Sequence, residues 1–323
     1  MTHFRTELHI DKNPDKIRYD SNIMSLGSGF SNEIVRHFDK YQFKVNSNPY
    51  GTTYNPLSIF NLIDITTHNR AVDDNLITET SGQWNHFDFH VRTNADSKEK
   101  LVKELTRKIQ STHESLKNTN YLMLTFGSAY VYKFVENQRV VANCHKAPGS
   151  LFKKELLTPQ AIVDGFRKVY HQLNNVDNII LMVSPVMHTN DSITLNAVSK
   201  SVLRLACHQI MAEFRYVKYF PAYEFLLSDL RDYRFYEQDL IHPNQMAMDY
   251  IFDKFVEAYV DQEERQDIHD VEQILDKIIT EPYNPQSESY QQSISIAKDK
   301  LNGLKTKLDL SNLMSELDLK GSL

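Results

Sequence analysis

Residues 98–126 read KEKLVKELTRKIQSTHESLKNTNYLMLTF and join two different hydrophobic patterns. The first part predicts an amphipathic helix over residues 98–116, because its buried-type side chains recur at helical spacing. The last six residues, 121–126, form a nearly continuous apolar run, as in strands that are buried on both faces of a sheet. A helix that leads into such a strand is typical of a parallel sheet covered by helices.

The same alternation continues on both sides of this stretch. Other apolar runs predict strands at residues 21–27, 178–184 and 217–220. Helical patterns occupy residues 30–41, 159–173, 196–214 and 243–259, the last opened by a proline. Residues 129–143 predict a hairpin at the rim of the sheet. The fold class is therefore α/β, with a parallel sheet and helices on both faces.

The character of the chain changes after residue 260. Residues 261–280 predict a charged helix, residues 281–289 a linker with two prolines, and residues 293–319 an amphipathic helix. We therefore expect a domain over residues 1–260 and a helical C-terminal extension over residues 261–323. The extension is expected to pack on the domain or to mediate self-association.

Composition excludes several classes of protein. Of the 323 residues, 41% are hydrophobic and 24% are charged, as in ordinary globular chains. The net charge of −6 argues against a nucleic-acid partner, which requires a clustered basic surface. No run approaches the ~20 apolar residues of a membrane span. Two cysteines, Cys144 and Cys207, make no disulfide framework, so we expect a cytoplasmic location.

Two short segments carry residues suited to acyl transfer. In DLIHP (239–243), Asp239 and His242 lie on one loop, where the carboxylate would fix the imidazole tautomer and stabilise the imidazolium. In GSGF (27–30), Ser28 follows the first strand, at the sheet edge where α/β proteins bind ligands. A dinucleotide fingerprint is disfavoured there, because Asn32 stands where the third glycine is required.

These segments belong to an ordered series of blocks by which the chain resembles a known family. The blocks are FRTEL (4–8), GSGFS (27–31), NPYG (48–51), YNPLS (54–58), TFGSA (125–129), NCHK (143–146), SPV (184–186), YFPAYE (219–224), DLRDYRFY (229–236) and DLIHP (239–243), with Gly82, Trp84, His86 and His90. Over residues 4–261 the chain resembles the GSCFA family, a branch of the SGNH (GDSL-like) hydrolase superfamily.

The resemblance implies a flavodoxin-like three-layer α/β/α sandwich. It also implies ester hydrolysis or acyl transfer on an acylated small molecule, glycan or lipid, without a metal or organic cofactor. Asp239 and His242 would be the acid–base pair, and Gly51 would lend an amide to the oxyanion hole. The superfamily's oxyanion asparagine is missing, because Ser128, Ala129 and Tyr130 follow Gly127. Asn143 is the expected substitute.

A second departure concerns the nucleophile. An ungapped overlay on the superfamily's Gly-Asp-Ser-Leu places Gly29 at the nucleophile position, where the family name has cysteine. In that register the protein is a catalytically silent binding or scaffolding module. If the turn is one residue shorter, Ser28 is the nucleophile and Gly29 supplies an oxyanion amide. We take the second register as our prediction, with the Ser28 hydroxyl about 3 Å from His242.

Other residues have simpler interpretations. His86 and His90 have the spacing of a zinc pair on a helix, but residues 87–89 alternate as in a strand, which favours a buried or pocket-lining pair. Cys144 and His145 are adjacent, so in a strand they would point to opposite faces. Arg231 and Arg234 are candidates for binding an anionic group of a substrate.

Overall fold

The computed structural model describes residues 6–189, 192–305, 307–308 and 310–321. Phe4 and Arg5, which begin the first matching block, lie outside the described residues. The chain forms two compact units. The first contains the segments up to residue 10, 22–36 and 45–252, and the second contains residues 11–21, 37–44 and 253–323.

A five-stranded parallel sheet forms the centre of the first unit, which confirms the predicted fold class. Its strands, in the spatial order β10-β9-β5-β1-β2, are β10 (Val217–Tyr219), β9 (Asn178–Val183), β5 (Tyr121–Phe126), β1 (Asn22–Gly27) and β2 (Lys44–Ser47). All six residues of β5 and all six of β9 are buried, as their apolar sequences require. The carboxyl ends of β1, β5 and β9 therefore meet at one edge.

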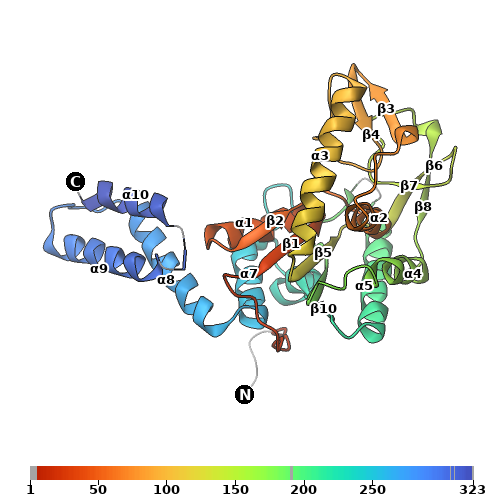
Figure 1. Ribbon diagram of the computed structural model, residues 1–323. Coiled ribbons are helices and arrows are strands. Elements are labelled where there is room, and N and C mark those ends of the chain that lie inside the picture. Colours follow the sequence, from red (N-terminus) through yellow and green to blue (C-terminus); the bar gives the residue numbers. More distant parts are fainter. Residues whose placement is uncertain (1–5, 190–191, 306, 309, 322–323) are drawn as a thin grey trace. The chain divides into compact units, whose positions relative to one another are not determined.

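Helices flank this sheet in a layered arrangement (Figure 1). They are α1 (Gly29–Lys40), α2 (Pro56–Thr67), α3 (Lys98–Lys117), α4 (Pro159–Tyr170), α5 (Ile193–Glu213) and α7 (Gln245–Tyr259). Helix α5 packs on β9 and β10, and α4 packs between α2 and α5. The buried residues of α3 are the five predicted from its spacing: Leu101, Leu105, Ile109, Thr112 and Leu116.

Helix boundaries differ from the sequence prediction by up to three residues, and one of them concerns the loop of His242. Helix α7 begins at Gln245 and not at Pro243. Pro243 instead pairs with Tyr236 in an isolated β-bridge, and the side chain of Asn244 accepts a hydrogen bond from the amide of Ala247 (3.1 Å). The proline therefore closes the loop that carries His242 before the helix starts.

Two small antiparallel sheets and several short helices complete the first unit. The strands are β3 (Ile77–Thr80) with β4 (Gln83–His86), and β7 (Val140–Val141), β6 (Tyr130–Phe134) and β8 (Phe152–Leu156). The short helices are Asp74–Leu76, Gly149–Leu151, α6 (Ala222–Glu224), a π-helical turn at Phe225–Leu230, and Tyr233–Phe235. The predicted hairpin is therefore present as β6 and β7, but it pairs with β8 in a separate sheet and does not extend the central one.

The second unit combines N-terminal segments with the C-terminal helices α8 (Gln262–Ile279), α9 (Glu288–Leu304) and α10 (Ser311–Gly321). The amphipathic stretch predicted as one helix over residues 293–319 is thus two helices. Helix α9 packs on α8 and α10, and this buries its apolar positions Ile294, Ala297, Leu301 and Leu304 within the chain. Ile17 pairs with Val260, and the Tyr41 hydroxyl donates to Glu272 (2.6 Å).

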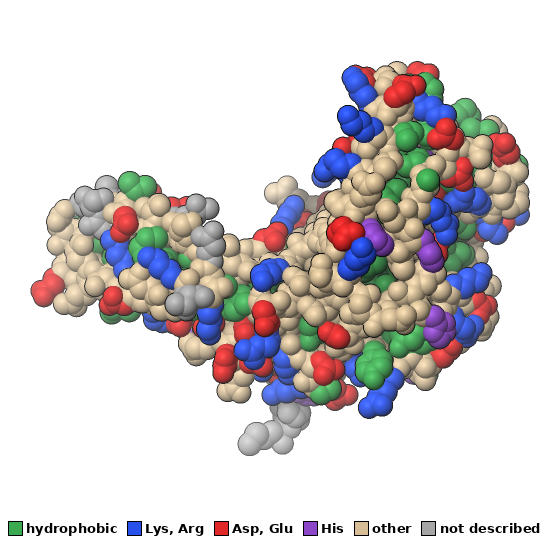
Figure 2. All heavy atoms as spheres, in the orientation of Figure 1, with side chains coloured by type: hydrophobic (Ala, Val, Ile, Leu, Met, Phe, Trp, Pro, Cys, Tyr) green, Lys and Arg blue, Asp and Glu red, His purple; other side chains and the backbone are tan. Residues whose placement is uncertain are grey.

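Two further observations concern the surface. On the face shown in Figure 2, acidic and basic side chains are interspersed, which is not the clustered basic surface that phosphate binding needs. Among the helices that the structure describes, none is long and apolar enough to cross a membrane.

Truncation after Val260 tests the construction of the second unit. We expect the sheet of the first unit to remain folded, and residues 11–21 and 37–44 to become protease-sensitive, because their partners in α8 are lost. Limited proteolysis with mass spectrometry, together with circular dichroism, measures both effects. Unchanged cleavage in these segments would contradict the assignment of the unit, and so would loss of the sheet signal.

Candidate functional site

The turn from β1 to α1 is held tightly against β5. Gly27 has φ +151°, and a Cβ at this residue would lie 2.3 Å from the Thr125 carbonyl oxygen, so only glycine fits. The Gly27 amide donates to Asn48 Oδ1 (2.8 Å), and the Ser28 amide donates to the Thr125 carbonyl (3.1 Å). These contacts fix where residues 28 and 29 lie at the carboxyl edge of the sheet.

Ser28 and Gly29 both line a pocket of about 370 Å³ at this edge. Ser28 is 2% exposed, and its hydroxyl is buried without a hydrogen-bond partner among the described residues. A Cβ added to Gly29 would meet nothing within 4 Å. The Ser28 hydroxyl is thus shielded from solvent, whereas a side chain at position 29 would have free space around its Cβ.

The loop with Asp239 and His242 reaches the same pocket. His242 Nδ1 bonds to Asp239 Oδ2 (2.7 Å), and the amides of Ile241 and His242 donate to Asp239 Oδ1 (2.9 and 3.0 Å). These bonds, first those from His242, lower the pKa of Asp239 to about 2. The ionised carboxylate therefore accepts from Nδ1–H and leaves Nε2 as the free nitrogen of the ring.

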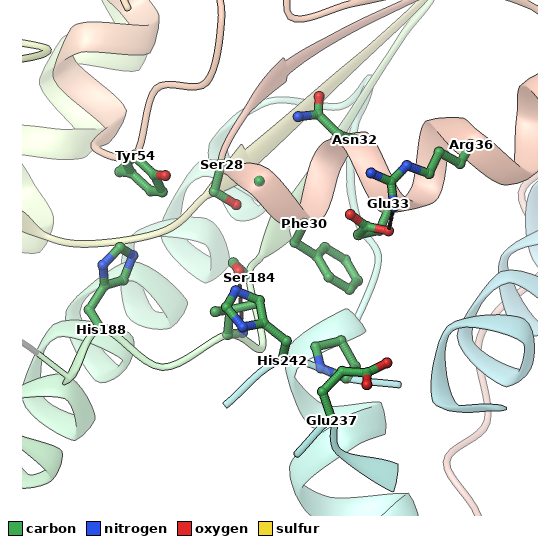
Figure 3. A pocket seen from close by; sticks show the side chains of 13 residues that line it. Ser28, Phe30, Asn32, Glu33, Arg36, Tyr54, Ser184, His188, Glu237 and His242 are labelled. Atoms are coloured by element: carbon green, nitrogen blue, oxygen red, sulfur yellow. Dashed lines mark hydrogen bonds and ion pairs between the residues drawn. The ribbon is translucent and has the colours of Figure 1, made fainter. Parts of the chain in front are cut away.

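Figure 3 shows Ser28 and His242 on opposite sides of one pocket. The predicted hydrogen bond between them is absent, since the Ser28 hydroxyl has no hydrogen-bond partner among the described residues. His242 stands on an exposed loop, with 59% of its side chain accessible. The loop is closed at its base by the Glu237 amide, which donates to the His242 carbonyl (2.8 Å). Sequence reasoning thus placed both residues at one pocket but was wrong about the contact.

A second histidine at the pocket was missed by the motif search. His188 follows β9, and its ring meets the Tyr54 ring edge-on at 5.2 Å. Burial, reinforced by the nearby Lys200, lowers the pKa of His188 to about 4. The signal that could have found it is position: polar residues after any strand of a parallel sheet reach the same edge.

Lys200 is a second residue near this edge of the sheet that the sequence analysis did not identify. It is 1% exposed, and its Nζ donates to the carbonyls of Gly127 (2.8 Å) and Ser184 (2.7 Å). Burial lowers the pKa of Lys200 to about 7. The side chain ties together the segments that follow β5 and β9.

The predicted oxyanion donors are placed less favourably. The Gly51 amide donates to the Asn48 carbonyl (2.7 Å), so it is engaged in its own turn. Gly51 needs to be glycine for another reason, since its φ is +83° and a Cβ would lie 2.4 Å from the His90 side chain. Asn143 lines a neighbouring cavity of about 600 Å³, and its Oδ1 accepts from the His145 amide (2.8 Å). Neither residue lines the pocket of Ser28.

The neighbouring cavity adjoins the first pocket at Tyr54 and His188, which line both. Its other walls carry aromatic and polar side chains, including Tyr130, Tyr132 and Lys154. The Lys154 ammonium lies 4.8 Å from the centre of the Tyr130 ring. A molecule bound next to Ser28 therefore has room to extend past Tyr54.

The remaining candidates have structural roles. His86 is buried, with Nε2 bonded to the Asp73 carbonyl (3.1 Å) and Nδ1 accepting from the Asp88 amide (3.1 Å). His90 Nδ1 accepts from the Arg92 amide (3.2 Å). Burial raises the pKa of the Cys144 thiol to about 11, which disfavours a reactive thiolate.

No group of three or more metal-binding side chains is present among the described residues. Arg231 and Arg234 are exposed, and neither lines the pocket of Ser28. The cation at that pocket is instead Arg36 of α1, which is ion-paired with Glu33 (2.5 Å).

Comparison with known proteins places this geometry in a family. The model of the GSCFA family matches residues 22–255, which is more than half of the chain. The match includes Ser28, Asp239 and His242. No curated protein matches the chain.

The pKa of Asp239 tests the geometry of the loop. We expect its carboxyl signal in carbon-detected NMR to titrate near pH 2, against about 3.9 for an unperturbed aspartate. Because the folded pKa is depressed, stabilisation by the ionised form is present above about pH 4 and is lost as the pH falls toward 2. In His242→Ala the pKa should rise only part of the way, since both backbone donors remain. A midpoint near 3.9 in the wild-type protein would contradict the structure.

Proposed function

We propose that this chain, which belongs to the GSCFA family, is a serine-type ester hydrolase or acyltransferase. The observation that carries the proposal is the Asp239–His242 pair, whose free Nε2 lies at the pocket that Ser28 also lines. The resemblance to the SGNH superfamily supports the same chemistry, and so does the parallel sheet with its pocket at the carboxyl edge.

The proposed reaction has two acyl-transfer steps. His242 Nε2 takes the proton from the Ser28 hydroxyl as Oγ bonds to the carbonyl carbon of the ester, and the carbonyl oxygen becomes an oxyanion. When the carbon–oxygen bond to the leaving alcohol breaks, the alcohol takes that proton from His242. Water or an acceptor hydroxyl then repeats the sequence on the acyl-enzyme. Asp239 stabilises the imidazolium in both steps.

The N-terminus of α1 supports charge stabilisation in this pocket. Gly29 and Phe30 begin the helix and line the pocket. The first amides of a helix have no intrahelical acceptor, and the helix dipole favours negative charge at this end. Gly29 allows close approach of a substrate, because it has no side chain. For attack, the Ser28 hydroxyl and His242 must come within hydrogen-bond distance of each other.

A second candidate function is a binding module without catalysis. Two observations favour it: the Ser28 hydroxyl is buried, and the open position beside it is a glycine. In this case the pocket would bind an acylated small molecule, glycan or lipid without cleaving it. Both functions use the same pocket, so kinetics with substitutions at residues 28 and 29 separate them.

Hydrolysis of 4-nitrophenyl acetate tests the nucleophile. We expect Ser28→Ala and His242→Gln each to lower kcat by about 10⁴-fold or more, because each removes a group that acts in both steps. We expect Gly29→Ser to give no gain, since its new hydroxyl would hinder approach to the helix N-terminus. A fluorophosphonate probe should label Ser28, as located by mass spectrometry.

Two results would contradict the serine assignment. Activity that survives Ser28→Ala would exclude Ser28 as the nucleophile. An inactive wild-type protein that gains His242-dependent activity in Gly29→Ser or Gly29→Cys would show that position 29 is the nucleophile position, and would support the binding module for the natural chain. His208→Gln on the exposed surface of α5 is the control for a histidine change outside the pocket.

A further inference from the structure

The pocket lacks the donor that the superfamily places at the end of its third block. Ala129 occupies the position of that asparagine and is fully buried. Asn143 lines the neighbouring cavity and not the pocket of Ser28. Asn32 does line the pocket, but its Oδ1 accepts from Asn48 Nδ2 (2.7 Å), and its side chain points away from His242 in Figure 3. A side chain of another type could therefore take the place of this donor beside the amides of α1.

His188 lies where such a donor is needed. Its Nε2 is 3.1 Å from the point that a Cβ on Gly127 would occupy, and Ser28 Cβ is also 3.1 Å from that point. The imidazole and Ser28 are therefore close neighbours across Gly127. In Figure 3 the His188 ring lies with Tyr54 to one side of the space between Ser28 and His242.

The imidazole of His188 is free to bind a ligand. Its nitrogens have no hydrogen-bond partner among the residues that the structure describes, although the ring lines the pocket. The backbone holds the residue in place, since the His188 amide donates to Asn196 Oδ1 (3.0 Å). The ring is packed edge-on against Tyr54. A positioned side chain with unused polar atoms is suited to recognition.

The surroundings of His188 favour the neutral ring, which donates from one nitrogen. Burial is the larger cause of its lowered pKa, and the Lys200 ammonium is the second. A general base must become positively charged, which the nearby cation opposes. His242 has the opposite environment, because its partner is the Asp239 carboxylate. The two histidines are therefore suited to different tasks.

We propose that His188 donates a hydrogen bond from its neutral imidazole to the acyl oxygen of the ligand in the Ser28 pocket. In the reaction proposed above, on which this inference rests, that oxygen becomes the oxyanion, and His188 fills the role left vacant at Ala129. Lys200 acts as a positioning residue, because it ties the Gly127 and Ser184 carbonyls beneath the ring. Donors of this kind contribute most in the transition state.

Substitutions at His188 test the donor in 4-nitrophenyl acetate hydrolysis. His188→Phe keeps a ring against Tyr54 but has no donor, and we expect a loss in kcat of about 10²–10³-fold with little change in KM. His188→Asn restores an N–H and should recover part of that loss. The pH at which activity is half-maximal should stay unchanged, since His242 remains the base. His208→Phe is the matched control, and thermal unfolding confirms that the variants fold.

A binding measurement separates this inference from the proposed function. Sodium acetate supplies a carboxylate oxygen without needing a nucleophile, and histidine side-chain ¹⁵N NMR reports its contact. We expect acetate to shift the His188 Nε2 signal and raise the His188 pKa, and His188→Phe to weaken acetate binding by about tenfold or more.

The outcomes of the two measurements are distinct. An inactive wild-type protein whose His188 still responds to acetate would overturn the hydrolase proposal and support the donor. Unchanged kcat in His188→Phe, or a His188 signal that acetate leaves unshifted, would overturn the donor.

Discussion

The contact between Gly27 and Thr125 is the constraint on which the rest of the site depends. The last residue of β1 lies so close to β5 that a Cβ would overlap the Thr125 carbonyl, and the positive φ turns the chain away from the sheet at once. Helix α1 therefore starts only two residues later, and its N-terminus faces the pocket. Asn48 bonds the Gly27 amide, and Asn32 of α1 accepts from Asn48, so the turn is fixed from both sides. A rigid turn of this kind holds the Ser28 and Gly29 positions in register with the ends of the neighbouring strands.

The two histidines of the pocket have different electrostatic environments, which suit them to different roles. Both rings face the pocket, yet His242 is paired with a carboxylate and His188 lies near an ammonium group. Burial and the ammonium favour the neutral ring of His188, whereas the Asp239 carboxylate holds the His242 ring by its Nδ1 atom. The buried Lys200 is thus placed where its charge lowers the pKa of His188.

The central strands of the sheet were predicted correctly from the sequence, because nearly continuous apolar runs such as residues 121–126 and 178–183 are stable only when both faces are buried. The family resemblance led to the prediction that Ser28 and His242 share a site, and both line one pocket, although the predicted hydrogen bond between them is absent. The sequence did not predict His188 or Lys200. Both residues matter through contacts with residues that are distant in sequence. Lys200, for example, donates to the carbonyls of Gly127 and Ser184, and the local spacing of residue types does not reveal such contacts.

The sequence also did not predict the break between α9 and α10, because one amphipathic pattern runs through both helices. The hydrogen bond of Ser28 depends on the exact positions of the turn and of the His242 loop, which the pattern of residue types does not specify.

The second unit has a consequence for how the chain folds during synthesis. Tyr41 bonds Glu272 across a separation of 231 residues, and Ile17 pairs with Val260. These two contacts can form only after the residues between them have been synthesised, whereas the β1–β5–β9 pairings join segments that are closer in sequence and can form earlier. Until then the stacked rings of Tyr19 and Phe43 lack the helices that complete their unit. Burial of these aromatic side chains is therefore completed only when the C-terminal helices of the unit have formed.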